Sequence, residues 1–362
     1  MHPELLRPGP LSMARDTWRS DLGGLADPAR FREPLDITSQ DTAGLLRLLR
    51  SMWQIRVVEE QVAALVVAGL AKTPCHLGIG QEAVAVGVCA ELRNTDRVFG
   101  GHRSHSQFLA LGGSPFGLLA EILGRVEGVS HGMGGSMHLY GASVGFHGSV
   151  PLVGATIPIA VGAALAAQMD GADSIAVAFF GDGACEEGVF HESLNLAVVY
   201  NLPILFVCEN NLFASHLDIQ FRQPSDRVAR YADAHRVRNR TVDGNDVLTV
   251  QGAAKELIDA ARAGQGPGLL EAVTYRFRGH VGPNEDIDVG VNRRMEDVES
   301  WKRRCPIRRL SEALLAGKAV TEAELKRLQT DVHAEVAEAV SKAKAGQYPP
   351  TAALLDLVYA ND

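Results

Sequence analysis

The sequence predicts an α/β protein with a mainly parallel sheet flanked by helices and a helical C-terminal segment. From about residue 41 to 290, apolar strand-like runs alternate with helical patterns, as in layered α/β folds. Two of these runs, 174–180 and 202–208, are separated by one helical pattern and end in polar turns, which indicates a βαβ unit. Residues 291–362 form charged segments rich in Glu, Lys and Ala, which favours solvated helices with one buried face.

The expected elements follow in chain order. Residues 1–40 are rich in Pro, Arg and Asp and show little periodicity, so we expect an N-terminal arm or a partly ordered extension. The α/β domain should span 41–290 and the helical C-terminal extension 291–362. We expect helices over 45–70 and 81–92, a strand at 96–99, a helix around 108–111, a buried helix within 153–169, strands at 174–180, 202–208 and 269–277, and a long helix over 322–345.

Composition narrows the class of function. The chain has 362 residues, 46% of them hydrophobic, which is enough for a large core. A net charge of −8 argues against nucleic acid as a partner. The N-terminus has no apolar run of signal-peptide length, and the apolar stretch 153–169 is too short to cross a membrane. We therefore expect a soluble enzyme with no membrane association.

Cysteine usage points to a reducing compartment. The five cysteines are odd in number and scattered, and no CxxC pair occurs. This pattern predicts neither a disulfide framework nor a zinc site. Buried thiols in a cytoplasmic protein are the expected interpretation.

The most informative feature is a pair of polar turns after the two central strands. The run 174–180 ends on Gly181-Asp182-Gly183, and the run 202–208 ends on Asn210-Asn211. The carboxyl ends of neighbouring parallel strands lie side by side, where such sheets bind ligands. One carboxylate with amide oxygens suits Mg²⁺ that also binds phosphate oxygens. The glycines would let the backbone approach a diphosphate, and a helix beginning after Gly183 would favour its charge.

Other polar turns carry candidate site residues. Arg103 follows the strand at 96–99 and could clamp a diphosphate through its bidentate guanidinium. The run 131–138, HGMGGSMH, would allow close backbone approach to a ligand. A lone histidine is seldom catalytic, but four lie in or beside glycine-flanked turns: His76, His102, His105 and His280. The alternatives without a catalytic role are a packed position at a strand end for His76 and a surface position on a helix for His105.

Taken in order, these motifs resemble the alpha subunit of the first component of the 2-oxo acid dehydrogenase complexes. That group includes the pyruvate, branched-chain and acetoin dehydrogenases. The resemblance covers roughly residues 45–350 and rests on seven landmarks: CHLGIGQEAVAVG, GHRSH, GMGGSMHL, VGATIPIAVGAALA, GDGACEEGVFHESLNLA, CENNLF and YRFRGH. It implies the thiamine diphosphate-binding fold, with thiamine diphosphate and Mg²⁺ as cofactors.

The resemblance also implies a role for individual residues. Asp182 and Asn211, with the backbone oxygen of Phe213, would ligate Mg²⁺. His76, His105 and His280 would be catalytic, with the first two along the route to the reacting carbon. The residues that would bind the cofactor are His102, Arg103, Pro151, Val153, Asp182, Gly183, Ala184, Asn211 and His280; Arg103 and His280 would reach the diphosphate, and Pro151 and Val153 the aminopyrimidine ring.

One α/β region of about 250 residues is present, whereas single-chain thiamine enzymes need two. The family supplies the second region, with the glutamate that faces the pyrimidine ring, from a separate beta subunit. We therefore expect a chain that is inactive alone and a heterotetramer of two alpha and two beta subunits. The Ala- and Gly-rich segment 153–167 is a candidate for close helix packing there, with core packing as the alternative.

The implied reaction is decarboxylation of a 2-oxo acid and transfer of the acyl unit to a lipoyl group, with a lipoyl-bearing acyltransferase as a further expected partner. Two departures leave an alternative open. His102 stands where pyruvate dehydrogenases usually have tyrosine, and the loop after His280 is acidic, with Glu285, Asp286 and Asp288, instead of carrying regulatory serines. The alternative is a ketol transferase that forms acyloins on a sugar or other carbonyl acceptor.

Overall fold

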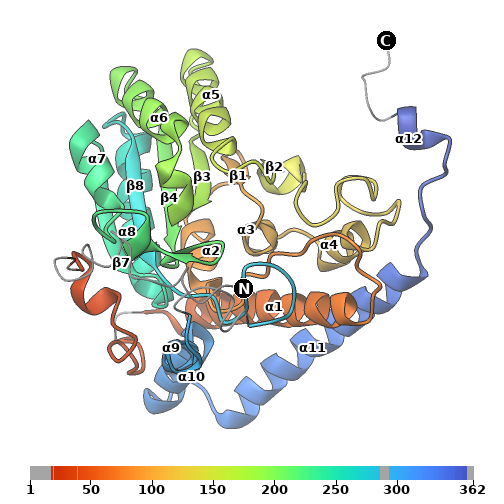
Figure 1. The fold of residues 1–362 in the computed structure, drawn as a ribbon. Coiled ribbons are helices and arrows are strands. Elements are labelled where there is room, and N and C mark those ends of the chain that lie inside the picture. The colour runs from red at the N-terminus through yellow and green to blue at the C-terminus, as the bar shows by residue number, and fades with distance from the viewer. Residues whose placement is uncertain (1–17, 19, 39, 286–292, 357–362) are drawn as a thin grey trace, which may run out of the picture.

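The computed structural model describes residues 18, 20–38, 40–285 and 293–356, and within them the predicted α/β class is confirmed (Figure 1). Six parallel strands form one sheet in the order β2-β1-β3-β4-β8-β7, and β5 and β6 form a separate antiparallel pair. The bounds of the strands are Arg97–Gly100 for β1, Phe146–Ser149 for β2, Ala176–Gly181 for β3, Ile204–Asn210 for β4, Phe213–Ala214 for β5, Leu217–Asp218 for β6, Arg238–Asp243 for β7 and Gly268–Val273 for β8.

Helices cover both faces of the sheet, and a helical segment follows it (Figure 1). The predicted long helix is α11, which begins with a capping box between Thr321 and Glu324. The α-helices are α1 (Thr42–Val67), α2 (Glu82–Cys89), α3 (His105–Ala110), α4 (Pro115–Ile122), α5 (Thr156–Met169), α6 (Gly188–Val199), α7 (Ala229–His235), α8 (Val247–Arg262), α9 (Met295–Lys302), α10 (Pro306–Ala316), α11 (Glu322–Ala345) and α12 (Ala353–Asp356). Short 3-10 turns are η3 (Gly23–Leu25), η4 (Ala142–Val144), η5 (Asp182–Glu186) and η6 (Ile219–Phe221).

The central strands are buried on both faces, which explains their continuous apolar runs. Along β3, Val177 and Phe179 belong to the core that also contains buried residues of α1, α2 and α8. The alternate residues Ala178 and Phe180 belong to a second core with residues of α5, α6 and α7. Each strand residue therefore has a fixed face, and the polar residues that follow the strands emerge at their carboxyl ends.

The order of the strands creates a crevice. After β1 the chain runs to β2 at one edge of the sheet and then returns through α5 to β3, on the other side of β1. β1 and β3 are therefore neighbours whose following loops leave in opposite directions, the arrangement in which open α/β sheets bind ligands. β4 lies next to β3, with Gly181 opposite Glu209, so the turns that follow both strands lie at this crevice.

The segments outside the sheet are packed onto it. Leu22 and Leu35 from the N-terminal region are buried in the larger core, as are residues of α9, α10 and α11. Arg304 and Arg309 donate to the two carboxylate oxygens of Asp243 at the end of β7, at 2.8 and 2.7 Å. The C-terminal helices are thus joined to the α/β region by a shared core and by buried charge pairs.

Three expectations about the elements need correction. The α-helix expected directly after Gly183 begins at Gly188, because the 3-10 turn η5 comes first. The strand expected over 269–277 ends at Val273, where its pairing with β7 and β4 ends. The helix within 153–169 is only partly buried, since Ile159 and Met169 are 51% and 78% exposed.

Two further observations concern the cysteines and the helices. The five cysteines are free thiols, and four of them are buried. Within the described residues, no helix combines the length and the apolar character that crossing a membrane requires.

Candidate active site

A pocket of about 360 Å³ lies at the carboxyl ends of β1, β3 and β4, within the size range of small-molecule sites. It gathers eleven of the residues that the sequence singled out, from six separate stretches of the chain. These residues are His76, His102, Arg103, Pro151, Val153, Asp182, Gly183, Ala184, Asn211, Phe213 and His280.

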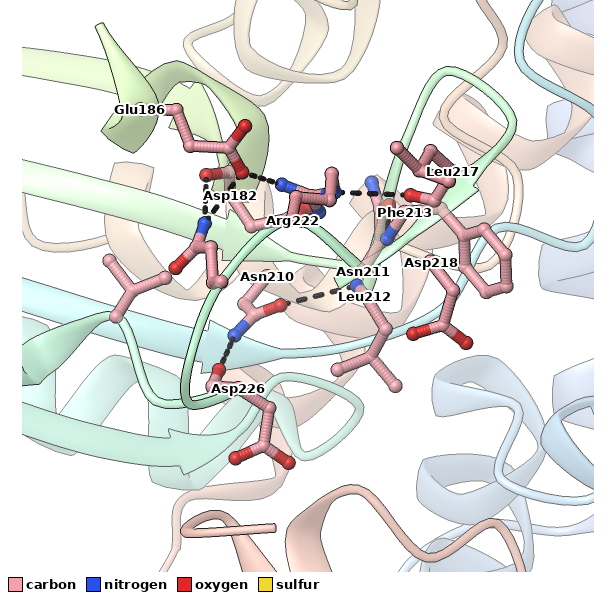
Figure 2. Close-up of polar contacts among 12 residues, drawn as sticks. Asp182, Glu186, Asn210, Asn211, Leu212, Phe213, Leu217, Asp218, Arg222 and Asp226 are labelled. Carbon is pink, nitrogen blue, oxygen red and sulfur yellow. Dashed lines mark hydrogen bonds and ion pairs between the residues drawn. The ribbon is translucent and has the colours of Figure 1, made fainter. Parts of the chain in front are cut away.

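Asp182 lies at the end of β3, at the start of the turn η5, and is almost fully buried. Its Oδ2 atom pairs with the guanidinium of Arg222, as Figure 2 shows. Its Oδ1 atom is buried and has no hydrogen-bond partner among the described residues. Burial raises the pKa of Asp182, and Arg222 opposes that change. A buried carboxylate oxygen without a partner is costly, so it indicates a missing cation or donor.

The two asparagines after β4 have different tasks (Figure 2). Asn210 is fully buried, and its Nδ2 atom donates to the Asp226 carbonyl at 2.8 Å and to Glu271 at 2.7 Å. These contacts hold the end of β4 against β8 and against the segment that carries Asp226. Asn211 lines the pocket, accepts a bond from the Phe213 backbone at 3.3 Å, and donates to Gln81 at 3.3 Å. Its side-chain oxygen is therefore the amide oxygen of the pair that lies at the pocket.

The two glycines beside Asp182 have different surroundings: Gly183 is tightly packed and Gly181 faces open space. A Cβ atom on Gly183 would lie 2.7 Å from the Cβ of Ala214, so a side chain there would push β5 away. A Cβ atom on Gly181 would meet nothing within 4 Å, because that position faces the pocket. The backbone is therefore open to close approach by a ligand at Gly181 and is packed against β5 at Gly183.

The half-buried Arg103 and the buried Arg276 make the pocket region strongly cationic. Arg103 donates to the carbonyl oxygens of Leu77, at 2.7 Å, and of His280, at 3.1 Å. Arg276 donates to the Ser215 carbonyl at 2.9 Å, and its Nη1 atom has no partner in the described part of the chain. Burial lowers the pKa of Arg103 to about 10 and that of Arg276 to about 9. Guanidinium groups that are bonded to carbonyls and lack a paired carboxylate suit an anionic ligand.

Three of the four candidate histidines form a cluster. The ring centroids of His76 and His102 are 4.6 Å apart, and those of His76 and His280 are 4.9 Å apart. Burial, reinforced by the charge of Arg103, lowers the pKa of His76 to about 2, of His102 to about 4 and of His280 to about 3. All three imidazoles are therefore neutral at pH 7, so each can both donate and accept a hydrogen bond.

His105 is the exception among the predicted catalytic residues. Its side chain is fully buried and is not among the residues that line the pocket. The Nδ1 atom is 3.0 Å from Glu59, and the Nε2 atom is 2.8 Å from the Ser136 hydroxyl. Glu59 also accepts the backbone N–H of Gly78 at 2.9 Å. These contacts hold His105 behind the pocket wall, where it joins α1 and α3 to the turn after His76.

Comparison with known proteins assigns the family. Residues 50–352 match the dehydrogenase E1 component family. The chain belongs to this family. It is 37% identical over 330 residues to the alpha subunit of the acetoin:2,6-dichlorophenolindophenol oxidoreductase of Bacillus subtilis, covering 91% of this chain and 97% of that protein. It is 39% identical over 311 residues to the pyruvate dehydrogenase E1 component subunit alpha of Zymomonas mobilis, covering 85% and 86%.

The resemblance predicted from the landmarks is therefore confirmed: this member of the family is an alpha-type component of a 2-oxo acid dehydrogenase. A further relative, the acetoin oxidoreductase alpha subunit of Cupriavidus necator, is 37% identical over 337 residues, covering 89% of this chain and 98% of that protein. These relatives support the dehydrogenase interpretation over the ketol transferase. Membership of this family implies thiamine diphosphate as the cofactor.

Sequence reasoning missed several residues of the site in this E1 chain. Gln81, Met137, Thr156, Glu209 and Ser215 also line the pocket. Four of them stand inside recognised landmarks: Gln81 in the one that begins at Cys75, Met137 in GMGGSMHL, Thr156 in VGATIPIAVGAALA, and Glu209 in CENNLF. Their position inside those landmarks was the available signal. Arg276 lies one residue beyond Tyr275 in the landmark YRFRGH but carries no pattern of its own.

Glu209 predicts how cofactor binding in this E1 chain depends on pH. Burial raises the pKa of Glu209 to about 7, and Arg103 opposes that rise. As pH rises through 7, Glu209 loses its proton and adds a negative charge that repels a diphosphate. Thiamine diphosphate affinity should therefore fall relative to that of Glu209→Gln, by up to about tenfold per pH unit above 7. Calorimetric titrations of both proteins, each in complex with its beta partner, at pH 6, 7 and 8 measure this. Parallel pH profiles would rule out the effect.

Proposed function

We propose that this chain is the alpha subunit of a two-subunit enzyme that requires thiamine diphosphate and Mg²⁺, decarboxylates a 2-oxo acid and passes the acyl unit to a lipoyl acceptor. One observation carries the proposal. A buried carboxylate with one oxygen that lacks a partner among the described residues, an amide and the guanidinium of Arg103 meet at the carboxyl ends of adjacent parallel strands, and Arg276 adds a second buried cation nearby. A metal and a diphosphate together would satisfy all of these groups.

The metal would be held by Asp182, Asn211 and the backbone oxygen of Phe213. The fit is supported by the buried Oδ1 atom of Asp182 and by the three residues lining one pocket. One carboxylate and two neutral oxygens leave the rest of an octahedron to phosphate oxygens and water, which is how Mg²⁺ is usually bound.

The diphosphate would be held by Arg103 and His280, with the backbone N–H groups of Gly183 and Ala184. Arg276 would add charge from behind, because its Nη1 atom has no partner in the residues described. The open space at Gly181 supports close approach of the phosphates to the chain. These interactions would strengthen once a second chain covers the pocket and excludes water from it.

Thiamine diphosphate, when bound, supplies the electron sink that decarboxylation of a 2-oxo acid needs. His76, His102 and His280 would then surround the substrate as neutral imidazoles, which can donate a hydrogen bond to a developing oxyanion or accept one from the substrate. Pro151 and Val153 would contact the aminopyrimidine ring through their backbone. His105 would act only through Glu59 and the turn that carries His76.

A beta partner would complete the site. The relatives are named as alpha subunits, which supports a second subunit for this chain as well. Val153 lines the pocket and is 52% exposed, its neighbour Leu152 is 70% exposed, and Ile159 and Met169 on α5 are also exposed. Apolar side chains gathered at a pocket mouth and on the helix behind it favour coverage by another chain. We propose a cytoplasmic heterotetramer of two alpha and two beta subunits, with a lipoyl-bearing acyltransferase as a further partner.

The acceptor can be tested directly. The alpha and beta chains, with Mg²⁺ and thiamine diphosphate, should consume pyruvate or another short 2-oxo acid and acylate a lipoylated protein domain. The same mixture with an aldehyde or sugar acceptor should form little acyloin. Mass spectrometry of the lipoyl domain and chromatography of the small products measure both outcomes. Acyloin formation without lipoyl acylation would favour the ketol transferase and refute the proposal.

A further inference from the structure

We propose that Arg222 is a positioning residue for the metal ligand Asp182 and selects Mg²⁺ over Ca²⁺. The inference rests on the proposed function, because it assumes that a divalent cation binds at Asp182. Arg222 lies directly after the turn η6, outside every motif that the sequence analysis recognised. Its guanidinium lies between Asp182 and Glu186 on one side and the loop of β5 and β6 on the other (Figure 2).

Every nitrogen of this guanidinium has an assigned acceptor. Nη2 pairs with Oδ2 of Asp182, Nη1 pairs with Oε1 of Glu186, and Nε donates to the Leu217 carbonyl at 3.1 Å. The Arg222 side chain is only 5% exposed. A planar group held at three points and shielded from water can adopt few other positions, so it fixes the orientation of the carboxylate that it contacts.

The consequence concerns the other oxygen of Asp182. Because Oδ2 is engaged by Arg222, only the buried Oδ1 atom, which has no described partner, is left for a metal. Asp182 can therefore provide one ligand oxygen and not two. Mg²⁺ prefers such single oxygens in a compact octahedron, whereas Ca²⁺ is larger and readily takes both oxygens of a carboxylate.

Arg222 also fixes the distance between the two sides of the metal site. Through Leu217 it holds the β5–β6 hairpin, which follows Asn211 directly and begins with Phe213. Gly183 contacts the same hairpin, since a Cβ atom there would lie 2.7 Å from Ala214. Groups that orient metal ligands typically change metal affinity by about 10- to 100-fold when they are removed.

The test uses the alpha–beta complex saturated with thiamine diphosphate, titrated with Mg²⁺ or with Ca²⁺ in a calorimeter. Arg222→Met should weaken Mg²⁺ binding by about 10- to 100-fold and Ca²⁺ binding much less, so the Mg²⁺-to-Ca²⁺ affinity ratio should fall by about tenfold or more. Arg222→Lys should recover part of the ratio. Arg227→Met is the matched control, because Arg227 pairs with the half-exposed Asp233 away from the pocket.

Three results would overturn the inference. An unchanged ratio in Arg222→Met would mean that Arg222 does not restrict Asp182, and equal losses for both metals would indicate a structural role only. Tighter Mg²⁺ binding would mean that the guanidinium competes with the metal for Asp182. If Arg222→Met does not fold, Glu186→Gln carries the test, because it removes one anchor of Arg222 at a side chain that is 35% exposed. That variant should lower the ratio by a smaller factor, and an unchanged ratio would refute the proposal.

Failure of the proposed function would look different. In that case the unaltered complex would bind neither metal in a way that depends on thiamine diphosphate. If the unaltered complex binds Mg²⁺ but the Arg222 and Glu186 variants keep its selectivity, only the role of Arg222 is lost.

Discussion

Asp182→Ala is expected to abolish Mg²⁺-dependent binding of thiamine diphosphate to the alpha–beta complex. Asp182 is the only carboxylate among the proposed metal ligands, and its Oδ1 atom is buried without a partner in the described structure. Without it, Mg²⁺ would be held only by neutral oxygens, and the buried charge of Arg222 would lose one of its two carboxylates. The affinity should fall by more than about a hundredfold, beyond the usual loss on removing a group that merely orients a ligand.

Calorimetric titration of the complex with thiamine diphosphate, at fixed Mg²⁺, measures this effect. Asp182→Asn is the stricter variant, because it keeps the volume and removes only the charge. Asp218→Asn is the matched control: its carboxylate belongs to the neighbouring hairpin but does not line the pocket. Normal affinity in both Asp182 variants would sink the assignment of the metal site.

The second large effect concerns the partner subunit. The purified alpha chain should release no carbon dioxide from any 2-oxo acid, and turnover should appear when the beta subunit is added. The physical reason is that the glutamate expected to face the pyrimidine ring belongs to the beta subunit. The pocket, whose lining residue Val153 is 52% exposed, is also left open to water until a second chain covers it. Water at the mouth weakens every electrostatic interaction inside the pocket.

Carbon dioxide release, or reduction of an artificial electron acceptor, follows the reconstitution as beta subunit is titrated in. Turnover should saturate at one beta chain per alpha chain. An alpha chain carrying Asp182→Ala serves as the control, since it should assemble with beta and remain inactive. Robust turnover by the unaltered alpha chain alone would show that a complete site exists within it.

Much of the site could be predicted because its signals are local. A strand, a Gly-Asp-Gly turn, a helix and a second strand ending in two asparagines occur within about 40 residues, and parallel pairing then places Gly181 opposite Glu209. The long helix expected roughly over 322–345 is α11, and both of its ends have local causes: the capping box of Thr321 and Glu324, and Gly346 directly after it. Where the cause of a structure lies within one or two turns of chain, the pattern is sufficient.

Other features depend on contacts between distant segments. Arg103 meets the carbonyl of His280 across 177 residues, and Asn211 meets Gln81 across 130. His105 stands in a motif that suggested catalysis, yet Glu59 and Ser136 hold it behind the pocket wall. Neither periodicity nor a turn motif predicts which distant residue a buried side chain will contact. Those contacts depend on how whole helices pack against the sheet.

The residues alone determined the fold class, the family and the groups that meet at the carboxyl ends of β3 and β4. Tertiary structure decided which oxygen of Asp182 is available, that three histidines cluster as neutral rings, and that Arg222, 40 residues beyond Asp182, contacts it. The physical reason is the same in each case. Burial and neighbouring charge set the protonation and orientation of a side chain, and both are properties of the packed protein, established only when segments far apart in the chain come together.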